Sequence, residues 1–292
     1  MIGKRTVSVS IVAANYNNGK YLQQFIESVS ASTVLPHELI IVDDGSTDDS
    51  LTVLNGYSDL LFLRVIPFKQ NLGFTAALNA GIEASTGKYI MRADPDDLLH
   101  PERIGQQYQF MEENPDLDVL GSNVLYFNDQ DGSDITVSNF PLTDIAIKKA
   151  YLQGEHGLMH ATTILKTNVF KQYRYQHIFP GEDYELFSRM VKDGHKFQNL
   201  ARPLYKVRVH AGSSSSNLKF ESIRQTFAFR DQIFGTKTSK CRIVIYFQHI
   251  RHYRSYQMAG NSITKYFHLL LSVLFYPAKL VKRLKKATRQ AE

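Results

Sequence analysis

The stretch G-K-Y-I-M-R-A-D-P-D-D-L-L-H-P-E-R occupies Gly87–Arg103 and joins a short apolar run to three acids, Asp94, Asp96 and Asp97. Like charges repel each other, so three carboxylates that follow a strand need a compensating partner. Mg²⁺ and Mn²⁺ take oxygen ligands and commonly bind one or two carboxylates together with the phosphates of a substrate. The alternative is a solvated turn, because Asp-Pro favours turns. The stretch therefore predicts either a divalent metal site or an exposed acidic turn, and the remaining sequence must decide between them.

Length and composition restrict the class of protein. The chain has 292 residues and is 43% hydrophobic, which suits one large α/β domain or two smaller ones. Cys241 is the single cysteine of the sequence, so an internal disulfide and a zinc site built from several cysteines are both excluded. A lone cysteine also indicates a reducing compartment. The apolar run after Lys4 and Arg5 is short and alternates with serine, which fits a strand better than a signal peptide.

Positive charge is concentrated near the C-terminus. Residues 234–292 carry 12 Lys and Arg and one acid, a net +11, which leaves −5 on residues 1–233 out of a total of +6. Within this region the apolar and aromatic stretch Ile263–Val281 precedes the basic run Lys282–Lys286. It is more polar than the roughly 20 apolar residues of a spanning helix. The pattern predicts an interfacial anchor on an anionic membrane, where each basic residue contributes about 1 kcal/mol. The alternative is a helix packed on the body with a solvated basic end, and nucleic-acid binding is disfavoured.

The first hundred residues alternate short apolar runs with helical patterns. Such an alternation predicts an α/β fold with a mostly parallel sheet flanked by helices. The expected strands are Val7–Ala13, Glu38–Val42, Leu61–Ile66 and Tyr89–Ala93, and the expected helices are Tyr21–Ser30 and Phe74–Ala84.

Polar residues follow each of these strands. Asn15, Asp43 with Asp44, Asn71 and the acids of Asp94–Asp97 all fall at a predicted strand end. Ligands of open α/β sheets bind beyond the carboxyl ends of the strands. We therefore expect one crevice to contain all four groups.

The second half is less regular. Its expected helices are Ile104–Glu113, Asp144–Gln153 and Gly181–Lys192, its expected strands are Val119–Phe127, His160–Leu165 and Arg202–Val209, and residues from Phe220 onward have helical character. Glu182 and Asp183 lie in the first turn of one helix, where acids are stabilised by the helix dipole.

Several motifs occur in an order that resembles the family 2 glycosyltransferases, which have the nucleotide-sugar-binding GT-A fold. They include S-I-V-A-A-N-Y-N from Ser10, I-I-V-D-D-G-S-T-D-D-S from Ile40, N-L-G-F-T-A-A-L-N-A-G-I from Asn71, H-A-T-T from His160, G-E-D-Y-E-L-F-S-R-M from Gly181 and Y-K-V-R-V-H-A-G-S-S-S-S from Tyr205. The resemblance is to enzymes that build bacterial surface polysaccharides such as O-antigen or capsule. It implies a catalytic domain over 1–216, with 1–100 binding nucleotide and 101–216 binding acceptor. Residues 217–292 would form the helical, basic extension.

The resemblance also implies roles for individual residues. Asp183 would be the general base with Glu182 beside it, and Asp96 would ligate Mn²⁺ or Mg²⁺, with His210 near the metal and the diphosphate. His210 could equally be an ordinary histidine. The nucleotide-sugar site would comprise Ala14, Asn15, Tyr16, Asp43, Asp44, Asn71 and Asp94.

The implied reaction is inverting transfer of a sugar from a nucleotide diphosphate, with UDP expected, to a hydroxyl of an acceptor. The acceptor would be a glycan or a polyprenyl-diphosphate-linked sugar. With the basic tail on an anionic membrane, the expected location is peripheral, on the cytoplasmic face of the bacterial inner membrane. A single base opposite the leaving group gives in-line attack, so an α-linked donor should give a β-linked product.

Two other functions fit parts of the sequence. A sugar nucleotidyltransferase would carry an early Gly-rich phosphate loop, but Gly19 is the only glycine between Gly3 and Gly45. A non-catalytic, membrane-bound carbohydrate-binding protein would not require the acids Asp96 and Asp183. Both alternatives are therefore less favoured than the transferase.

Overall fold

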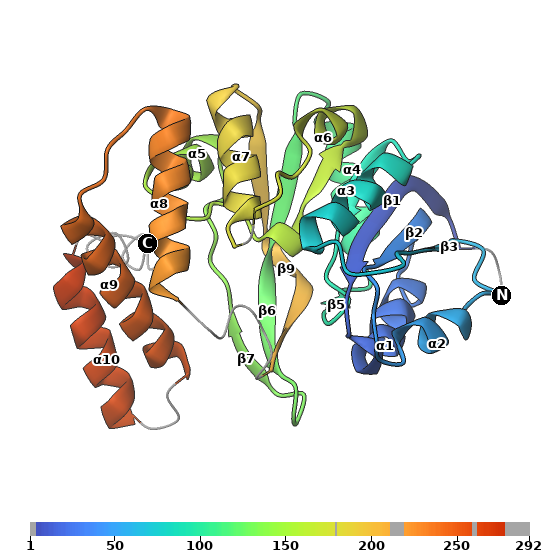
Figure 1. Cartoon of the computed structure of the whole chain (residues 1–292), viewed down its shortest axis with the longest axis horizontal. Helices are drawn as coiled ribbons and strands as arrows, with labels where there is room; N and C mark the ends of the chain where they lie inside the picture. The colour runs from blue at the N-terminus through green and yellow to red at the C-terminus, as the bar shows by residue number, and fades with distance from the viewer. Residues whose placement is uncertain (1–3, 179, 211–218, 259–261, 278–292) are drawn as a thin grey trace. The chain divides into compact units, whose positions relative to one another are not determined.

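The computed structural model describes residues 4–178, 180–210, 219–258 and 262–277 (Figure 1). The chain divides into two compact units, Met1–Ser213 and Ser214–Glu292. The predicted boundary at residue 216 lies outside the described residues. The assignment of 1–100 to nucleotide and 101–216 to acceptor stays a prediction.

The first unit opens with alternating strands and helices, as the sequence predicts (Figure 1). In chain order they are β1 (Thr6–Asn15), α1 (Gly19–Ser30), β2 (Leu35–Asp43), α2 (Ser50–Asn55), β3 (Leu63–Pro67), α3 (Phe74–Ala84) and β4 (Tyr89–Arg92). β1 pairs in parallel with β2 and β4, and β2 pairs in parallel with β3. The carboxyl ends of these four strands therefore lie along one edge of the sheet.

The sheet becomes mixed in the rest of this unit. The further elements are β5 (Leu98–Leu99), α4 (Arg103–Glu113), β6 (Val119–Asn128), β7 (Asp134–Val137), α5 (Asp144–Leu152), a 3₁₀ turn (His160–Thr162), β8 (Ile164–Lys166), α6 (Thr167–Tyr173), α7 (Glu182–Lys192) and β9 (Phe197–Val209). The strand order is β3-β2-β1-β4-β8-β6-β9-β5, with β7 paired to β6. β8 runs antiparallel to both β4 and β6, so the parallel arrangement stops after β4.

Several predicted strands begin at other residues in the structure, and the strand expected at Arg202–Val209 is β9, which begins earlier, at Phe197. His160–Leu165 was expected as one strand, but the strand begins only at Ile164, after the 3₁₀ turn. The Thr163 hydroxyl donates to the His160 carbonyl oxygen at 2.9 Å, and such side-chain bonds compete with a strand ladder. The third strand begins at Leu63 because the preceding Leu61 is fully exposed and contributes nothing to the core.

The core lies on both faces of the parallel strands. Val9, Ile11 and Ala13 of β1 belong to a buried apolar cluster with the apolar side of α1. Val12 points to the other face, where a Cβ at Gly81 of α3 would lie 2.5 Å from its Cγ1. Alternate residues of a strand point to opposite faces, so α1 and α3 cover opposite sides of β1 (Figure 1).

The second unit is helical, which confirms the expected helical extension. It contains α8 (Phe220–Phe234), α9 (Lys240–Met258) and α10 (Ser262–Phe275). α9 and α10 are joined by a hydrogen bond of 2.9 Å between His249 Nδ1 and the Ser272 carbonyl oxygen. Within the described ranges, no helix combines the length and the apolar character that a membrane crossing requires. The basic run Lys282–Lys286 lies outside the described residues.

A buried carboxylate connects three segments of the sheet. Glu38 Oε1 accepts hydrogen bonds from Ser10 Oγ at 2.6 Å and from the backbone nitrogen and hydroxyl of Thr86, each at 2.7 Å. Burial acts to raise the pKa of Glu38, but these hydrogen bonds outweigh burial and lower the pKa. The ionised carboxylate therefore joins β2 to β1 and to the turn before β4.

We expect Glu38→Gln to lower the free energy of unfolding at neutral pH by about 1–3 kcal/mol, because the amide oxygen is a weaker acceptor. The folded pKa is depressed, so the contribution of Glu38 is present above the unfolded pKa of about 4.3 and is lost as the pH falls through the folded pKa. Urea unfolding at about pH 7 and about pH 3.5 should show that the difference in unfolding free energy between the variant and wild type becomes smaller in acid. Glu113→Gln, at the exposed end of α4, is the control. An equal difference in unfolding free energy at both pH values would contradict the assignment of Glu38 as an ionised carboxylate with a lowered pKa.

Candidate active site

The loops after β1 and β2 are joined by the side chains that the sequence singles out. Asn15 Nδ2 donates to Asp43 Oδ2 at 2.7 Å, and both residues are fully buried. The Ser46 hydroxyl donates to the same carboxylate at 2.7 Å. Asn17 has a positive φ of 54°, and its Oδ1 accepts the Thr47 N–H at 2.8 Å. These bonds hold the two loops together at the carboxyl edge of the sheet.

Asp44 attaches the loop that precedes α3. Its carboxylate accepts the backbone N–H groups of Leu72 at 2.7 Å and Gly73 at 2.9 Å. Asn71 is therefore held beside the end of β2, as predicted. Asn71 and Tyr16 are exposed, whereas Ala14 and Asp44 are buried. The structure thus brings together the six predicted residues of these three loops, while their contacts with a nucleotide stay predictions.

The three acids after β4 have different surroundings. Asp94 is paired with the buried guanidinium of Arg92. Asp97 is buried and accepts the backbone N–H of Arg208 at 2.8 Å. Asp96 is partly exposed, and its Oδ2 lies 3.2 Å from His210 Nε2. Burial and the neighbouring carboxylates raise the pKa of both Asp96 and Asp97, so this loop is short of positive charge.

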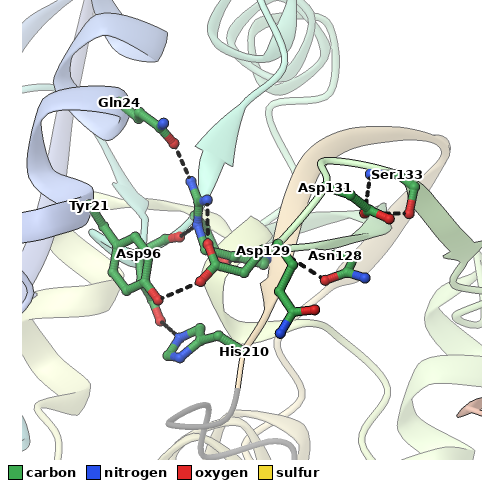
Figure 2. Close-up of polar contacts among 11 residues, drawn as sticks. Tyr21, Gln24, Asp96, Asn128, Asp129, Asp131, Ser133 and His210 are labelled. Carbon is green, nitrogen blue, oxygen red and sulfur yellow. Dashed lines mark hydrogen bonds and ion pairs between the residues drawn. The ribbon is translucent and has the colours of Figure 1, made fainter.

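Asp96 and His210 are the residues here that suit a divalent ion. A carboxylate oxygen suits Mn²⁺ or Mg²⁺, a neutral imidazole nitrogen is a common metal ligand, and the two side chains face each other (Figure 2). In the described part of the chain, no group of three or more His, Cys, Asp or Glu side chains could hold a metal ion. The pair fits an ion that takes its other ligands from substrate phosphates and water, which is the usual arrangement for Mg²⁺.

A second pair of acids lies at the start of α7. Asp183 Oδ2 is 3.5 Å from His156 Nε2, and Asp183 Oδ1 accepts the Tyr184 N–H at 2.7 Å. Burial acts to raise the pKa of Asp183, but the neighbouring His156 and the hydrogen bond from the Tyr184 N–H act to lower it, and the pKa lies well below its ordinary value. Burial and the charge of Asp183 raise the pKa of Glu182 to about 7. The pair therefore contains one firmly ionised carboxylate beside one that is close to half protonated at neutral pH.

Buried aromatic residues connect the two acidic groups. The Tyr175 hydroxyl lies 2.5 Å from His160 Nε2, and burial lowers the pKa of His160 to about 3, so this imidazole is neutral. Burial raises the pKa of the Tyr175 hydroxyl well above its ordinary value, and the charges of Asp183 and Asp94 both act on it. The two acids at the start of α7, Glu182 and Asp183, and the acid loop after β4 thus share one buried neighbourhood.

Sequence reasoning missed some of these connecting residues. Tyr175 follows α6 in an irregular segment and has no sequence signal, yet its backbone N–H and C=O both bond the side-chain amide of Asn79, at 2.9 and 2.8 Å. Arg92 did have a signal, because it is a charge at the end of an otherwise apolar strand. The predicted residues fall into three groups: the nucleotide loops, the pair Asp96 and His210 with Asp94 nearby, and the pair Glu182 and Asp183.

The first unit thus joins parallel strands, with acidic and amide side chains at their carboxyl edge, to a mixed half whose helix α7 begins with two acids. The family model of Glycosyl transferase family 2 matches residues 10–174, and the chain belongs to that family. This confirms the resemblance seen in the motifs, and the chain is a glycosyltransferase.

Relatives of known name agree with this membership. The amylovoran biosynthesis glycosyltransferase AmsE of Erwinia amylovora is 34% identical over 212 residues, which is 71% of this chain and 78% of the relative. The Escherichia coli UDP-Glc:alpha-D-GlcNAc-diphosphoundecaprenol beta-1,3-glucosyltransferase WfaP is 30% identical over 261 residues, covering 87% of this chain and 99% of the relative.

Solved structures confirm the GT-A fold. TarS of S. aureus in complex with UDP-GlcNAc matches with a TM-score of 0.64 and 20% identity, over 84% of this chain and 72% of that chain. The mannosyltransferase PcManGT of Pyrobaculum calidifontis, in complex with GDP-Man and Mn²⁺, matches with a TM-score of 0.57 and 12% identity, over 96% of this chain and 80% of that chain. At these identities the likeness concerns the fold.

The raised pKa of Glu182 predicts a pH-dependent stability. A carboxyl group whose folded pKa is about 7 opposes its own ionisation, so wild-type stability should fall as the pH rises from about 4.3 through 7, by up to about 3 kcal/mol. We expect Glu182→Gln, which does not titrate, to gain stability relative to wild type over this range. Urea unfolding at about pH 5 and about pH 8 measures the change. A difference in unfolding free energy between the two proteins that is the same at both pH values would show that Glu182 is not coupled to Asp183 in this way.

Proposed function

We propose that this protein is an inverting glycosyltransferase of bacterial surface polysaccharide synthesis. It moves a sugar from a nucleotide diphosphate, UDP in our proposal, to a hydroxyl of a glycan or of a polyprenyl-diphosphate-linked sugar. The names of the relatives support this: AmsE belongs to amylovoran biosynthesis, and WfaP is named for a UDP-Glc donor, a diphosphoundecaprenol-linked acceptor and a beta-1,3 product. TarS, whose fold is similar, was solved with UDP-GlcNAc.

The donor would bind at the carboxyl edge of the parallel strands. Asp44 and the residues around it would receive the base and ribose, and Asp94 would face the ribose or the sugar. Two exposed side chains, Tyr16 and Asn71, are available to a ligand there, while the buried Asp43 and Asn15 support the loops from behind. The nucleotide site would comprise Ala14, Asn15, Tyr16, Asp43, Asp44, Asn71 and Asp94.

Asp183 would act as the general base. As the acceptor oxygen forms its bond to the anomeric carbon, the hydroxyl proton passes to a carboxylate oxygen of Asp183. The bond between the anomeric carbon and the diphosphate oxygen breaks, and its electron pair leaves with the nucleoside diphosphate. The low pKa of Asp183 keeps it ionised. Repulsion between two ionised carboxylates favours protonation of one of them, and Glu182, with the raised pKa, is the one that holds the proton.

Asp96 and His210 would hold Mn²⁺ or Mg²⁺. When bound, such an ion supplies Lewis-acid stabilisation of the charge on the departing diphosphate. His210 lies 3.2 Å from Asp96, so the two side chains can approach one ligand together. The observation that supports the whole proposal is that the two acidic groups lie close to the same buried rings. Arg92, the partner of Asp94, lies 5.2 Å from the Phe74 ring, and the His160 ring lies 6.5 Å from Phe74 and 6.2 Å from Phe187 of α7.

We expect Asp183→Asn to lower the transfer rate by about 100-fold or more while UDP affinity is retained, because the base is lost and the nucleotide loops are unchanged. The assay follows UDP and product release over a panel of UDP-sugars, with and without Mn²⁺. Asp193→Asn, at the other end of α7, is the matched control and should keep full activity.

Three results would contradict the proposal. Full activity of Asp183→Asn would remove the base from the mechanism, and an α-linked product from an α-linked donor would exclude inversion. Release of pyrophosphate instead of UDP would identify a sugar nucleotidyltransferase.

We propose further that the protein binds peripherally to the cytoplasmic face of the bacterial inner membrane through α10. The apolar side chains Ile263, Phe267, Leu270 and Leu274 recur at the spacing of one helix face and are all exposed. The net charge of +11 on residues 234–292 complements an anionic lipid surface. An amphipathic face with basic surroundings is typical of interfacial helices rather than of spanning ones.

Phe267→Glu combined with Leu270→Glu should weaken binding to anionic lipid vesicles by about tenfold or more, since each buried apolar side chain contributes about 1.5–3 kcal/mol. Vesicle co-sedimentation of the full chain measures this, with zwitterionic vesicles as the comparison. Ile145→Glu, at an exposed apolar side chain of α5, is the control. Unchanged vesicle binding would contradict the role of α10.

A further inference from the structure

Arg208 is a buried cation beside the predicted metal pair, and it is 6% exposed. Its Nε donates to the Asp96 backbone oxygen at 2.7 Å, its Nη1 to Asp129 Oδ1 at 2.9 Å and its Nη2 to Gln24 Oε1 at 2.6 Å. Its own backbone N–H donates to Asp97 Oδ1 at 2.8 Å. One residue of β9 therefore connects the acid loop to α1 and to the end of β6.

Tyr21 completes this network from α1. Its hydroxyl donates to Asp129 Oδ2 at 3.0 Å, and its ring centroid lies 5.1 Å from that of His210 (Figure 2). The Arg208 guanidinium carbon lies 4.8 Å from the same Tyr21 ring. Both members of the predicted metal pair are thus supported by one network, Asp96 through its backbone and His210 through its ring.

The contacts of Arg208 indicate positioning rather than direct binding of a ligand. Each of its three guanidinium nitrogens donates to an acceptor of the protein, and the carboxylate that it pairs with belongs to Asp129. It contacts Asp96 at the backbone oxygen, so the Asp96 carboxylate remains directed at His210. A planar guanidinium can serve three acceptors at fixed angles, which a lysine ammonium cannot reproduce.

Helix α1, which supplies Tyr21 and Gln24 to this network, also contacts the nucleotide loops. The Gly19 N–H at the start of α1 donates to Asp48 Oδ2 at 2.9 Å, in the loop after β2. α1 therefore joins the loops predicted to hold the nucleotide to the network that supports Asp96 and His210.

We propose that Arg208 and Tyr21 are positioning residues that orient the Asp96–His210 pair and so set the affinity of the site for the divalent ion that accompanies the donor diphosphate. This inference rests on the proposed function. Residues that orient metal ligands typically change metal affinity by about 10–100-fold when they are replaced.

The test uses the full chain with Arg208→Lys and Tyr21→Phe. Mn²⁺ binding in the presence of UDP is followed by the electron paramagnetic resonance signal of free Mn²⁺, and UDP binding in EDTA by calorimetry. We expect Arg208→Lys to weaken Mn²⁺ binding by about tenfold or more and Tyr21→Phe to weaken it less, since the ring against His210 is kept. UDP affinity in EDTA should stay within about twofold of wild type, because neither residue belongs to the nucleotide loops.

Arg230→Lys is the matched control. Arg230 is also buried, pairs with Asp231 at 2.7 Å and lies 5.2 Å from the Phe227 ring, but it belongs to the second unit. Its replacement should leave Mn²⁺ and UDP binding unchanged. A purely structural role of Arg208 would lower the melting temperature without changing Mn²⁺ affinity.

The outcomes separate this inference from the proposed function. Mn²⁺ affinity within about twofold of wild type in both variants, with UDP binding intact, would overturn the positioning role alone. If Arg208→Lys loses UDP binding through misfolding, Tyr21→Phe decides the question, and an unchanged Mn²⁺ affinity in that variant overturns the inference. A wild type that binds no UDP would refute the proposed function, and the role of Arg208 with it.

Discussion

Repulsion among Asp94, Asp96 and Asp97 is the constraint on which the rest of this site depends. Each carboxylate is accommodated differently: Asp94 pairs with Arg92, Asp97 accepts the Arg208 N–H, and Asp96 faces His210. The raised pKa values of Asp96 and Asp97 indicate that this compensation is incomplete. A loop of this kind costs folding free energy, and in the proposed function a bound cation would offset that cost.

The mixed half of the sheet supplies the partners of these acids. β9 pairs with β6 and, at Leu98 and Leu99, with the short β5 that follows the acids directly. This pairing brings Tyr205 and Arg208 of β9 to the acid loop, where the Tyr205 hydroxyl accepts the Asp94 N–H at 2.8 Å. A wholly parallel sheet of the first four strands would leave the acid loop without these partners. The change in strand direction after β4 is therefore a requirement of the site.

The parts of this architecture that depend on local sequence were predictable. Apolar runs followed by polar turns located β1 to β4 and α3 to within a few residues, and the loops after β1 and β2 contain the side chains that the motifs indicated. The partners of the acid loop depend on long-range pairing, since Arg208 bonds Gln24 across 184 positions and Asp129 across 79. Arg208 had one local signal, because it is a charged residue near the end of the predicted strand Arg202–Val209, two positions before His210. Tyr175 had none. The 3₁₀ turn was missed because it depends on the bond from the Thr163 hydroxyl to the His160 carbonyl oxygen, and β7 was not predicted.

Two groups of neighbouring carboxylates occur in the first unit, and their pKa values shift differently. In the acid loop, burial and repulsion raise the pKa of Asp96 and Asp97, and in the proposed function a cation would balance their charge. At the start of α7, His156 stabilises the charge of Asp183, and Glu182 bears the repulsion through its raised pKa. Between the two groups lie the neutral His160 and the hydroxyl of Tyr175, which carry no charge at neutral pH. In the proposed mechanism this separation is needed, because a carboxylate that accepts a proton must stay ionised while a second acidic group, a short distance away, binds a cation with the leaving diphosphate.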